Sequence, residues 1–523
     1  MILDSYIVPL ATVALITSFF LFRFTLNKLE HKLKSKVPVH GVPMVPNSHW
    51  FLGHWRVLLL DFQTTWKTLS FDNANEDGLC SFWIGSQPAV TINEAKTARK
   101  ILNSNSMKPE LPHASKHSKK IGGKHSLLHM NGDEWKANRS AFTLALSGNG
   151  LKKMYQPIRS IATTLSETIT TKISLKAADA TEVDIEEILR MVTTDILGKT
   201  IFGVDFNCCN ELKQTKVTKA IEFLIDDFNR RYSSPLNPKA RFYCFPCERN
   251  RRFAKVLQMA RSIIKHSINE RNTAVESNEK KTDLISLLYQ ALKSSSGEEN
   301  IEEISVDMIM TTYLASYDST TTTLVYIFYS IATNSSVEEF CIKEINMALE
   351  KNPNELDPDE LPYCSAVVTE AIRLYPVFPL TFRTLEKPFK LGKVTLPRGL
   401  TVFVPIREMQ RDPRNYPKPN EFIPERWVRR SNQDGSKWIR RKSDDEISGG
   451  IAAGDNDAFL AFSAGGRNCP GQKLARAETC IIFAEILRHL KFELKPDYEL
   501  NLVRSGIAIK PKGGMPMTVR KRV

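Results

Sequence analysis

The segment Phe462-Ser463-Ala464-Gly465-Gly466-Arg467-Asn468-Cys469-Pro470-Gly471 carries the most information about the fold of this chain. It places one cysteine, Cys469, in a run of small residues that let backbone N–H groups approach the sulfur, with a cation two positions earlier. The apolar positions from Gln472 to Leu490 recur with the period of a helix, so the cysteine lies at the positive end of a helix. The segment therefore predicts that Cys469 binds a metal as a thiolate.

Other residues of this segment suit a flat heme better than a bare metal ion. Pro470 stiffens the turn, and Gly471 leaves space where a porphyrin would otherwise meet a side chain. We expect Arg467 to pair with a heme propionate and Phe462 to cover the sulfur side. An ordinary glycine-rich turn with a buried cysteine is the alternative that the segment alone leaves open.

The segment resembles the cysteine-ligand signature of the cytochrome P450 family and matches it at every defining position. The resemblance spans about Trp50 to Val523. It implies a mainly α fold with a small β-rich lobe, and heme b held by the Cys469 thiolate. An axial thiolate pushes electron density toward the iron and favours cleavage of the O–O bond.

A second motif agrees with this resemblance. Glu370 and Arg373 stand three residues apart in a helix that we expect to begin near Tyr363, so their charged groups share one side of it. By itself such a pair is most often a solvated surface ion pair. The resemblance implies instead that Glu370, Arg373 and Arg426, the last within Pro424-Glu425-Arg426-Trp427, form a buried charge network that braces the heme-binding core without touching substrate.

Further residues resemble the family's heme contacts. Trp135 and Arg139 are four apart, which places the indole and the guanidinium on one helix face. Alone, this spacing is also typical of any amphipathic helix. Arg383 falls where the family often carries another propionate partner. The resemblance thus predicts heme contacts from Trp135, Arg139, Arg383, Phe462, Arg467 and Cys469.

The oxygen-activating residues are expected on a helix from about Ser305 to Asn334. Its segment Ala315-Ser316-Tyr317-Asp318-Ser319-Thr320 resembles the family element in which an acid and an alcohol relay protons to dioxygen. We expect Asp318 and Ser319 to deliver protons, with Thr320 as a substitute donor. Ser316 and Ser319 depart from the family's usual Gly and Thr, and Ser319 lacks the methyl that restricts a threonine rotamer.

A structural role is the alternative for this segment, because the run of four threonines at 320–323 can back-bond within a helix. Within the family's fold, a heme-thiolate isomerase or dehydratase that works without O2 or a reductase remains open, as does a heme-binding protein without turnover. The favoured interpretation is a monooxygenase that inserts one oxygen atom of O2 into an apolar small molecule such as a fatty acid, sterol, terpenoid or xenobiotic.

The first 49 residues predict a membrane anchor and a linker. Residues 5–22 carry no charge and are rich in Ile, Val, Leu and Phe, which is enough to cross a bilayer at about 1.5 Å per residue. Lysines crowd the C-terminal flank at 28–36, so the positive-inside rule leaves the catalytic domain in the cytosol. We expect an anchor at 1–24, a basic and proline-rich linker at 25–49, a catalytic domain at 50–523, and an endoplasmic reticulum location.

The net charge of +14 fits an anionic membrane surface or an acidic protein partner. Aromatic and basic residues do not alternate as in nucleic-acid binders, so no nucleic-acid partner is expected. Lys136, Arg139, Lys473 and Arg476 are expected to surround the cysteine side of the heme. An acidic NADPH-cytochrome P450 reductase, with cytochrome b5 as a second candidate, would find complementary charge there.

Two cysteines and one insertion complete the predictions. Cys244 and Cys247 have zinc-site spacing, but no second pair stands near them, and the odd total of nine cysteines fits a reduced compartment. Residues 428–457 are expected to form a charged surface insertion of unassigned role.

Overall fold

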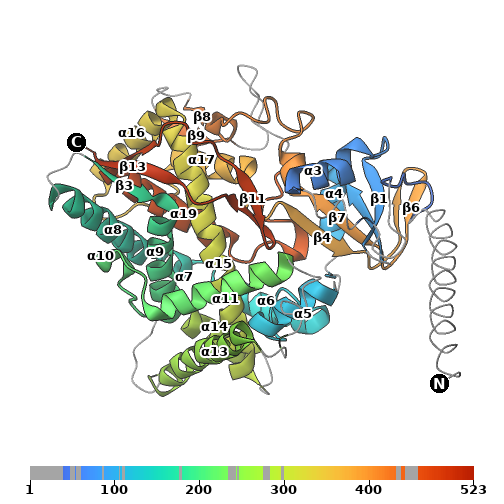
Figure 1. The fold of residues 1–523 in the computed structure, drawn as a ribbon, viewed down its shortest axis with the longest axis horizontal. Helices are drawn as coiled ribbons and strands as arrows, with labels where there is room; N and C mark the ends of the chain where they lie inside the picture. The colour runs from blue at the N-terminus through green and yellow to red at the C-terminus, as the bar shows by residue number, and fades with distance from the viewer. Residues whose placement is uncertain are drawn as a thin grey trace, which may run out of the picture. The chain divides into compact units, whose positions relative to one another are not determined.

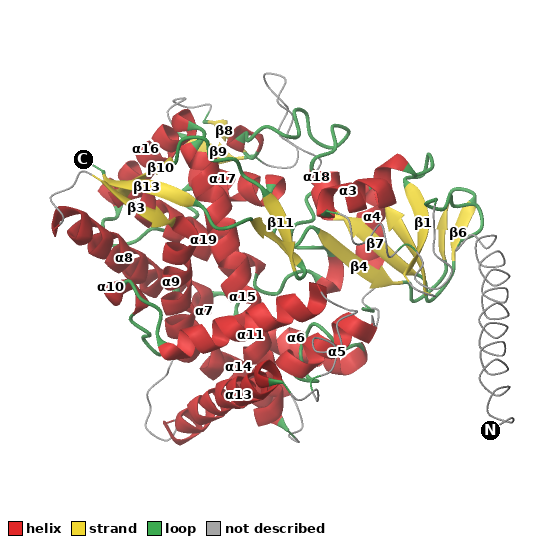
Figure 2. Cartoon of the chain, viewed as in Figure 1, coloured by secondary structure: helices red, strands yellow, loops and turns green. Residues whose placement is uncertain are grey.

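A computed structural model gives the fold of the chain (Figures 1 and 2). The structure describes residues 39–46, 54, 61–84, 87–104, 107–108, 112–175, 180–233, 243, 247–274, 283–295, 300–431, 437–441 and 457–522. The predicted anchor at 1–24, most of the linker at 25–49, Cys244 and most of the 428–457 insertion lie outside these residues. Among the helices of the described part, none is long and apolar enough to span a membrane.

The described residues form two compact units. The smaller unit contains residues up to 109 together with 380–408 and is built on a four-stranded sheet. Its strand order is β1-β2-β7-β4, with β2 parallel to β7 and the other two pairs antiparallel. The elements of this unit are α3 (Phe62–Lys67), η1 (Thr68–Asp72), β1 (Leu79–Ile84), β2 (Gln87–Ile92), α4 (Ala95–Ser104), β4 (Leu380–Thr384), β5 (Phe389–Leu391), β6 (Val394–Leu396) and β7 (Thr401–Pro405).

Aromatic side chains fill the core of this smaller unit. Trp66 stacks on Phe403 with ring centroids 5.7 Å apart, and Phe82 lies 5.6 Å from the same Phe403 ring. Alternate residues of β1 and β2 face this core, as the two-residue period of a strand requires. The sheet therefore has its own apolar core, which ties residues near 80 to residues near 400.

The larger unit, residues 110–379 and 409–523, is mainly helical. Its helices are α5 (Pro112–Gly122), α6 (Gly132–Ala145), α7 (Asn149–Lys152), α8 (Tyr155–Leu175), α9 (Ile185–Leu197), η2 (Gly198–Phe202), α10 (Cys208–Glu211), α11 (Lys216–Ser233), α13 (Glu248–Ala274), α14 (Leu284–Ser295), α15 (Ile301–Ala332), α16 (Ser335–Lys351), α17 (Pro362–Leu374), η4 (Pro424–Arg426), η5 (Gly465–Arg467) and α19 (Gln472–His489). A short helix, α18 (Ile406–Gln410), straddles the boundary of the two units.

Helix α15 runs through the middle of the larger unit, with α17 and α19 packed against it (Figure 1). Residues on every side of α15 are buried, because its sequence is apolar or small nearly all round. Glu302 and Glu303 in its first turn favour the positive end of the helix dipole. Near its other end, Phe328 contacts Phe483 of α19 with ring centroids 6.1 Å apart.

Strands are also part of the larger unit. A sheet of order β10-β13-β3 joins β3 (Ala180–Asp184) and β10 (Leu490–Leu494) to β13 (Pro516–Lys521). Two hairpins, β8 (Val428–Arg430) with β9 (Trp438–Arg440) and β11 (Leu502–Ser505) with β12 (Ala508–Pro511), complete it. Within the 428–457 insertion, residues 428–430 and 438–440 thus pair as antiparallel strands.

Candidate heme-binding site

The cysteine loop between η5 and α19 is held by its own backbone. Cys469 N donates to Phe462 O at 2.9 Å, and Asn468 N donates to Gly465 O at 3.0 Å. Ser463 and Gly465 adopt positive φ angles of 60° and 70°, a conformation that glycine accepts and serine resists. The backbone therefore folds back on itself and presents Cys469 one turn before α19 begins.

Helix α6 contacts this loop through Trp135 and Arg139, the two residues that their spacing in the sequence predicts on one face of the helix. Arg139 donates from Nη1 to Asn468 O at 2.7 Å and from Nη2 to Asn468 Oδ1 at 2.6 Å. A Cβ built on Gly466 would lie 3.2 Å from the Trp135 ring, so only glycine allows this approach without displacing the ring. Trp135 and Arg139 thus meet the loop residues adjacent to Cys469.

Arg467 is buried against the segment that precedes α6. Its Nη2 donates to Asn131 Oδ1 at 2.7 Å and its Nη1 to Leu127 O at 3.1 Å. Its guanidinium also lies 3.8 Å from the centroid of the Trp135 ring, a cation–π contact. Trp135, Arg139 and Arg467 therefore form one cluster around the cysteine loop.

Burial and two polar neighbours act in opposite directions on the pKa of the Cys469 thiol. Burial raises the pKa of the Cys469 thiol, and the Gly471 N–H and the Arg139 charge lower it only in part. A bound metal cation deprotonates a coordinating thiol outright. The Gly471 N–H and the Arg139 guanidinium would stabilise the Cys469 thiolate when a metal is bound.

The surroundings of the loop fit a heme. Cys469 is half-buried, although Ala477, Cys480 and Ile481 on the helix that follows are buried. A Cβ built on Gly471 would meet no atom within 4 Å, so the turn after the cysteine is open. Across the unit, Ala315 is exposed in the middle of α15 although Tyr313 and Tyr317 beside it are buried. The cysteine loop and the middle of α15, the two surfaces expected to contact the porphyrin, are thus both accessible.

The structure places the expected proton-delivering residues together on α15. Asp318 is buried and its Oδ1 accepts a hydrogen bond from Lys510 Nζ of β12. Ser319 Oγ donates to Ala315 O at 2.7 Å, and Thr320 is buried. Thr321 and Thr323 back-bond to the carbonyls of residues four positions earlier, as the structural alternative predicted for this run.

Arg383, the remaining expected heme contact, lies on β4 of the smaller unit. Its Nη1 donates to Phe382 O at 2.8 Å and to Thr381 Oγ1 at 3.3 Å. Burial lowers the pKa of its guanidinium to about 10. The propionate contact of Arg383 stays a prediction.

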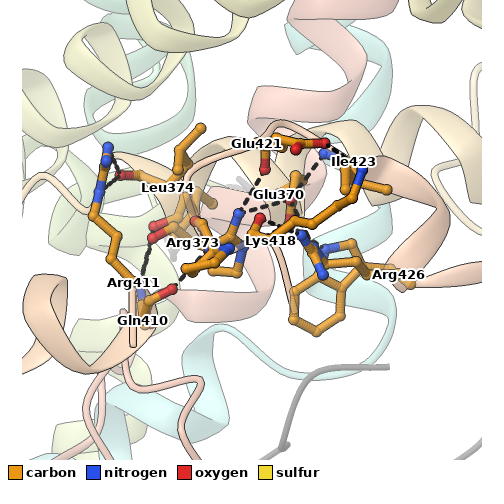
Figure 3. A network of polar contacts seen from close by, with 12 residues as sticks. Glu370, Arg373, Leu374, Gln410, Arg411, Lys418, Glu421, Ile423 and Arg426 are labelled. Atoms are coloured by element: carbon orange, nitrogen blue, oxygen red, sulfur yellow. Dashed lines mark hydrogen bonds and ion pairs between the residues drawn. The ribbon is translucent and has the colours of Figure 1, made fainter. Parts of the chain in front are cut away.

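The predicted charge network is present and completely buried (Figure 3). Arg373 Nε and Nη2 both donate to the Glu370 carboxylate at 2.8 Å, a bidentate pair within α17. Arg426 Nε donates to Glu370 Oε1 at 3.2 Å, and Trp427 Nε1 donates to Glu370 Oε2 at 2.9 Å. One carboxylate therefore joins α17 to η4, which confirms the structural role inferred for these three charged residues.

Arg373 also ties this network to the loop that leads to η4. Its Nη1 donates to Gln410 O and Pro419 O, both at 2.7 Å, and its Nη2 donates to Glu421 O at 3.0 Å (Figure 3). Gln410 in turn accepts a hydrogen bond from Leu460 N at 3.0 Å, just before the cysteine loop. The network therefore braces the chain immediately upstream of the cysteine loop.

A model of the cytochrome P450 family matches residues 43–516, which includes every residue of the cysteine loop, α6, α15 and the charge network. This chain belongs to the cytochrome P450 family. It is thus a heme-thiolate monooxygenase by family, and the matched range includes Cys469.

Similar P450 proteins come from several kingdoms. The chain is 26% identical to cytochrome P450 4X1 of Homo sapiens over 490 residues, covering 91% of this chain and 90% of that protein. It is 26% identical to cytochrome P450 CYP72A616 of Paris polyphylla over 510 residues, covering 96% and 91%. It is 24% identical to probable cytochrome P450 6d5 of Drosophila melanogaster over 418 residues, covering 75% and 77%.

Sequence reasoning missed three residues at this site. Asn468 and Asn131 receive the guanidinium groups of Arg139 and Arg467, and Lys510 pairs with Asp318. Asn131 precedes Gly132 at the start of α6, which is a recognisable N-cap signal, but its side chain binds Arg467 instead of capping the helix. Lys510 gives no sequence signal, because 192 residues separate it from Asp318.

Proposed function

We propose that this P450 is a membrane-anchored monooxygenase that receives NADPH electrons through cytochrome P450 reductase and oxidises an apolar small molecule. The arrangement of Cys469 carries this proposal: the loop backbone fixes the cysteine, and Trp135, Arg139 and Arg467 surround the loop. Heme b supplies O2 binding and O–O cleavage when its iron is held by the Cys469 thiolate. Trp135, Arg139, Arg383 and Arg467 would bind its propionates, and Phe462 would lie on the sulfur side.

Proton delivery is assigned to the side chains of α15. Asp318 holds a carboxylate beside Ser319, and the Ser319 hydroxyl can accept one proton and donate another. Thr320 is adjacent to Ser319 and would serve as a substitute donor. The exposed Ala315 one turn earlier supports this assignment, because it leaves room for a substrate on the same stretch of helix.

The electron donor is assigned from charge. Lys136 and Lys473 are exposed on α6 and α19, the two helices that meet the cysteine loop. Arg139 and Arg476 are not part of such a surface, because Arg139 binds Asn468 and Arg476 lies 5.1 Å from the Phe462 ring. An acidic reductase would therefore contact the two lysines, with cytochrome b5 as a second donor of the same charge.

The membrane location is assigned from sequence. The uncharged residues 5–22 would cross the endoplasmic reticulum membrane once and leave residues 50–523 in the cytosol as one catalytic domain. This arrangement would bring an apolar substrate, dissolved in the bilayer, close to the enzyme.

The carbon monoxide difference spectrum of the reduced holoenzyme tests the ligand. We expect the absorption band of a heme-thiolate carbonyl in the natural chain and its loss in Cys469→Ser, because a serine oxygen cannot replace the thiolate. Cys480→Ser is the matched control, since Cys480 is also buried and lies on α19. A thiolate band that persists in Cys469→Ser would refute the assignment.

Turnover tests the rest of the proposal. With reductase and NADPH, a panel of fatty acids, sterols, terpenoids and xenobiotics should yield a product that contains one oxygen atom from 18O2. Conversion of a lipid hydroperoxide without NADPH or O2 would favour an isomerase instead, and absence of turnover with all probes would favour a heme-binding protein.

A further inference from the structure

Lys510 and Asp318 form an ion pair between β12 and α15. Lys510 Nζ donates to Asp318 Oδ1, and the two side chains are only 11% and 12% exposed. Removing either partner of such a pair leaves a poorly solvated charge, which is costly. The pair therefore constrains the orientation of the Asp318 carboxylate much more than an exposed ion pair would.

The backbone of Ile509, the residue before Lys510, is fixed by two hydrogen bonds. Ile509 N donates to Val377 O at 2.9 Å, and Ile509 O accepts from Tyr326 Oη of α15 at 2.8 Å. Tyr326 lies eight residues after Asp318, about 12 Å along the same helix. The β11–β12 hairpin is thus attached to α15 at two points, one through a backbone carbonyl and one through the Lys510 side chain.

The tip of this hairpin packs against α11. Gly506 has a φ of 61°, and a Cβ built on it would lie 2.1 Å from Asn229 Oδ1 and 3.1 Å from Asn229 Cα. Only a glycine fits this turn against the helix. Val503 and Ile507, on either side of the tip, are 39% and 43% exposed. The hairpin therefore connects α11 to the carboxylate on α15.

We propose that Lys510 is a positioning residue that holds the Asp318 carboxylate, and that the β11–β12 hairpin makes this hold depend on the position of α11. The inference rests on the proposed role of Asp318 in proton delivery. When the hairpin is seated on α11, Lys510 fixes one carboxylate oxygen and leaves Asp318 Oδ2 for the proton route. Because Ile509 keeps the hairpin attached to α15, loss of the contact between the tip and Asn229 would loosen the hold of Lys510 on Asp318 without detaching the hairpin.

A double-mutant cycle measured by hydrogen exchange tests the contact in the holoenzyme. Lys510→Met and Asp318→Asn should each speed exchange of the amides in 502–511 by roughly tenfold, and the double variant should be no faster than the faster single variant. Lys512→Met is the matched control, because Lys512 is exposed two residues further on and should leave exchange unchanged. Additive effects of the two substitutions would overturn the proposal.

The solvent isotope effect on NADPH oxidation, measured with reductase and without added substrate, tests the positioning role. Lys510→Met should raise this effect as much as Asp318→Asn does, and Lys510→Arg should restore the natural value. The effects of the two substitutions on hydrogen exchange could be non-additive while Lys510→Met leaves the isotope effect unchanged. The pair would then be only structural, which overturns the positioning role.

Gly506→Ala tests the connection to α11, because the added methyl group meets Asn229 and displaces the tip. We expect an isotope effect close to that of Lys510→Met, and a natural value would refute the dependence on α11. These outcomes are distinct from failure of the proposed function. A thiolate band in Cys469→Ser refutes the function, whereas the exchange cycle reports only the contact between Lys510 and Asp318.

Discussion

Ser319 is one of the two serines of α15 singled out by the sequence analysis, and its hydroxyl is bound to the helix backbone. Ser319 Oγ donates to Ala315 O at 2.7 Å and lies 3.5 Å from Ser316 O. A threonine would be held in fewer rotamers by its methyl group. The serine can therefore leave the helix carbonyl and turn toward a substrate more freely than a threonine could.

Ser319→Ala should raise the fraction of NADPH electrons lost as hydrogen peroxide by roughly threefold to tenfold, because a proton donor is removed. Ser319→Thr should lower this fraction below that of the natural chain. The ratio of hydrogen peroxide released to NADPH consumed measures both. Thr333→Ala, at the exposed end of the same helix, is the control, and an unchanged ratio in Ser319→Ala would exclude a role for this hydroxyl.

Glu370 shows how much a single buried carboxylate can contribute to stability. It accepts hydrogen bonds from Arg373, Arg426, Trp427 and the backbone of Ile423. Burial lowers the pKa of Arg426, and the charge of Glu370 opposes that effect. Without Glu370, two guanidinium groups would remain buried with no counter-charge in the network.

Glu370→Gln should therefore lower the free energy of unfolding by about 3–5 kcal/mol. Denaturant unfolding followed by tryptophan fluorescence measures the change. Lys351→Met is a suitable control, because Lys351 forms an exposed pair with Glu360 at 2.8 Å, and its loss should cost about 0–1 kcal/mol. Equal effects of the two substitutions would contradict the buried network.

At the scale of elements, α19 carries two buried carboxylates whose pKa values shift in opposite directions. Burial raises the pKa of Glu478 to about 8, and no other group opposes it. For Glu485 burial also acts to raise the pKa, but the hydrogen bond from His489 and the charge of Arg159 outweigh it and bring the pKa to about 2. Arg159 Nε lies 3.0 Å from Glu485 Oε2, which joins α8 to α19.

Glu478 should make the protein less stable as pH rises. Between its unfolded pKa of 4.5 and its folded pKa of about 8, the folded state binds the extra proton, so the free energy of unfolding falls with pH through this window. At about 1.4 kcal/mol per pKa unit, the loss is up to about 5 kcal/mol. Glu478→Gln should therefore remove this slope, as measured by denaturant unfolding from pH 5 to pH 8.

Glu485→Gln, on the same helix, should affect the pH dependence of stability in the opposite direction. The folded pKa of Glu485 lies below its unfolded value of 4.5, so its contribution is present above pH 4.5 and is lost as pH falls toward 2. The variant should be less stable than the natural chain at pH 7 and equal to it near pH 2. For each variant, the quantity to compare is its free energy of unfolding minus that of the natural chain. If this difference changed with pH in the same direction for Glu478→Gln and Glu485→Gln, the assignment of the two environments would be contradicted.

Several elements could be predicted from the sequence alone. The helix expected at 305–334 is observed at Ile301–Ala332, and the one expected from Gln472 to Leu490 ends at His489. Pro362 and Pro376 bracket α17 as helix start and stop signals. Residues 389–405 form three short strands, because turns at Gly392 and Gly399 with positive φ interrupt the extended chain.

At the scale of the whole molecule, the distribution of exposed positive charge predicts where the electron donor binds. Lys473→Glu reverses an exposed charge beside the cysteine loop and should raise the KM for reductase by roughly threefold to tenfold at low salt. Added salt should shrink this difference, because exposed charges are screened over about 10 Å at 0.1 M. Steady-state reduction of cytochrome P450 at several ionic strengths measures the effect.

The exposed Lys255 on α13 provides the control for this prediction. Lys255→Glu changes the net charge equally but lies on a helix that does not meet the cysteine loop. Equal effects of Lys255→Glu and Lys473→Glu would mean that only net charge matters, and no effect of salt would remove the electrostatic argument altogether.

The sequence by itself determined the family and the buried network and predicted the ligand cysteine, because each depends on residue types at short, fixed spacings. The tertiary structure alone decided which distant residues meet: Lys510 with Asp318, Asn468 with Arg139, and strand 180–184 with strand 516–521. The physical reason is that a helix or loop motif fixes its geometry within a few residues. A contact across hundreds of residues depends instead on how whole elements pack.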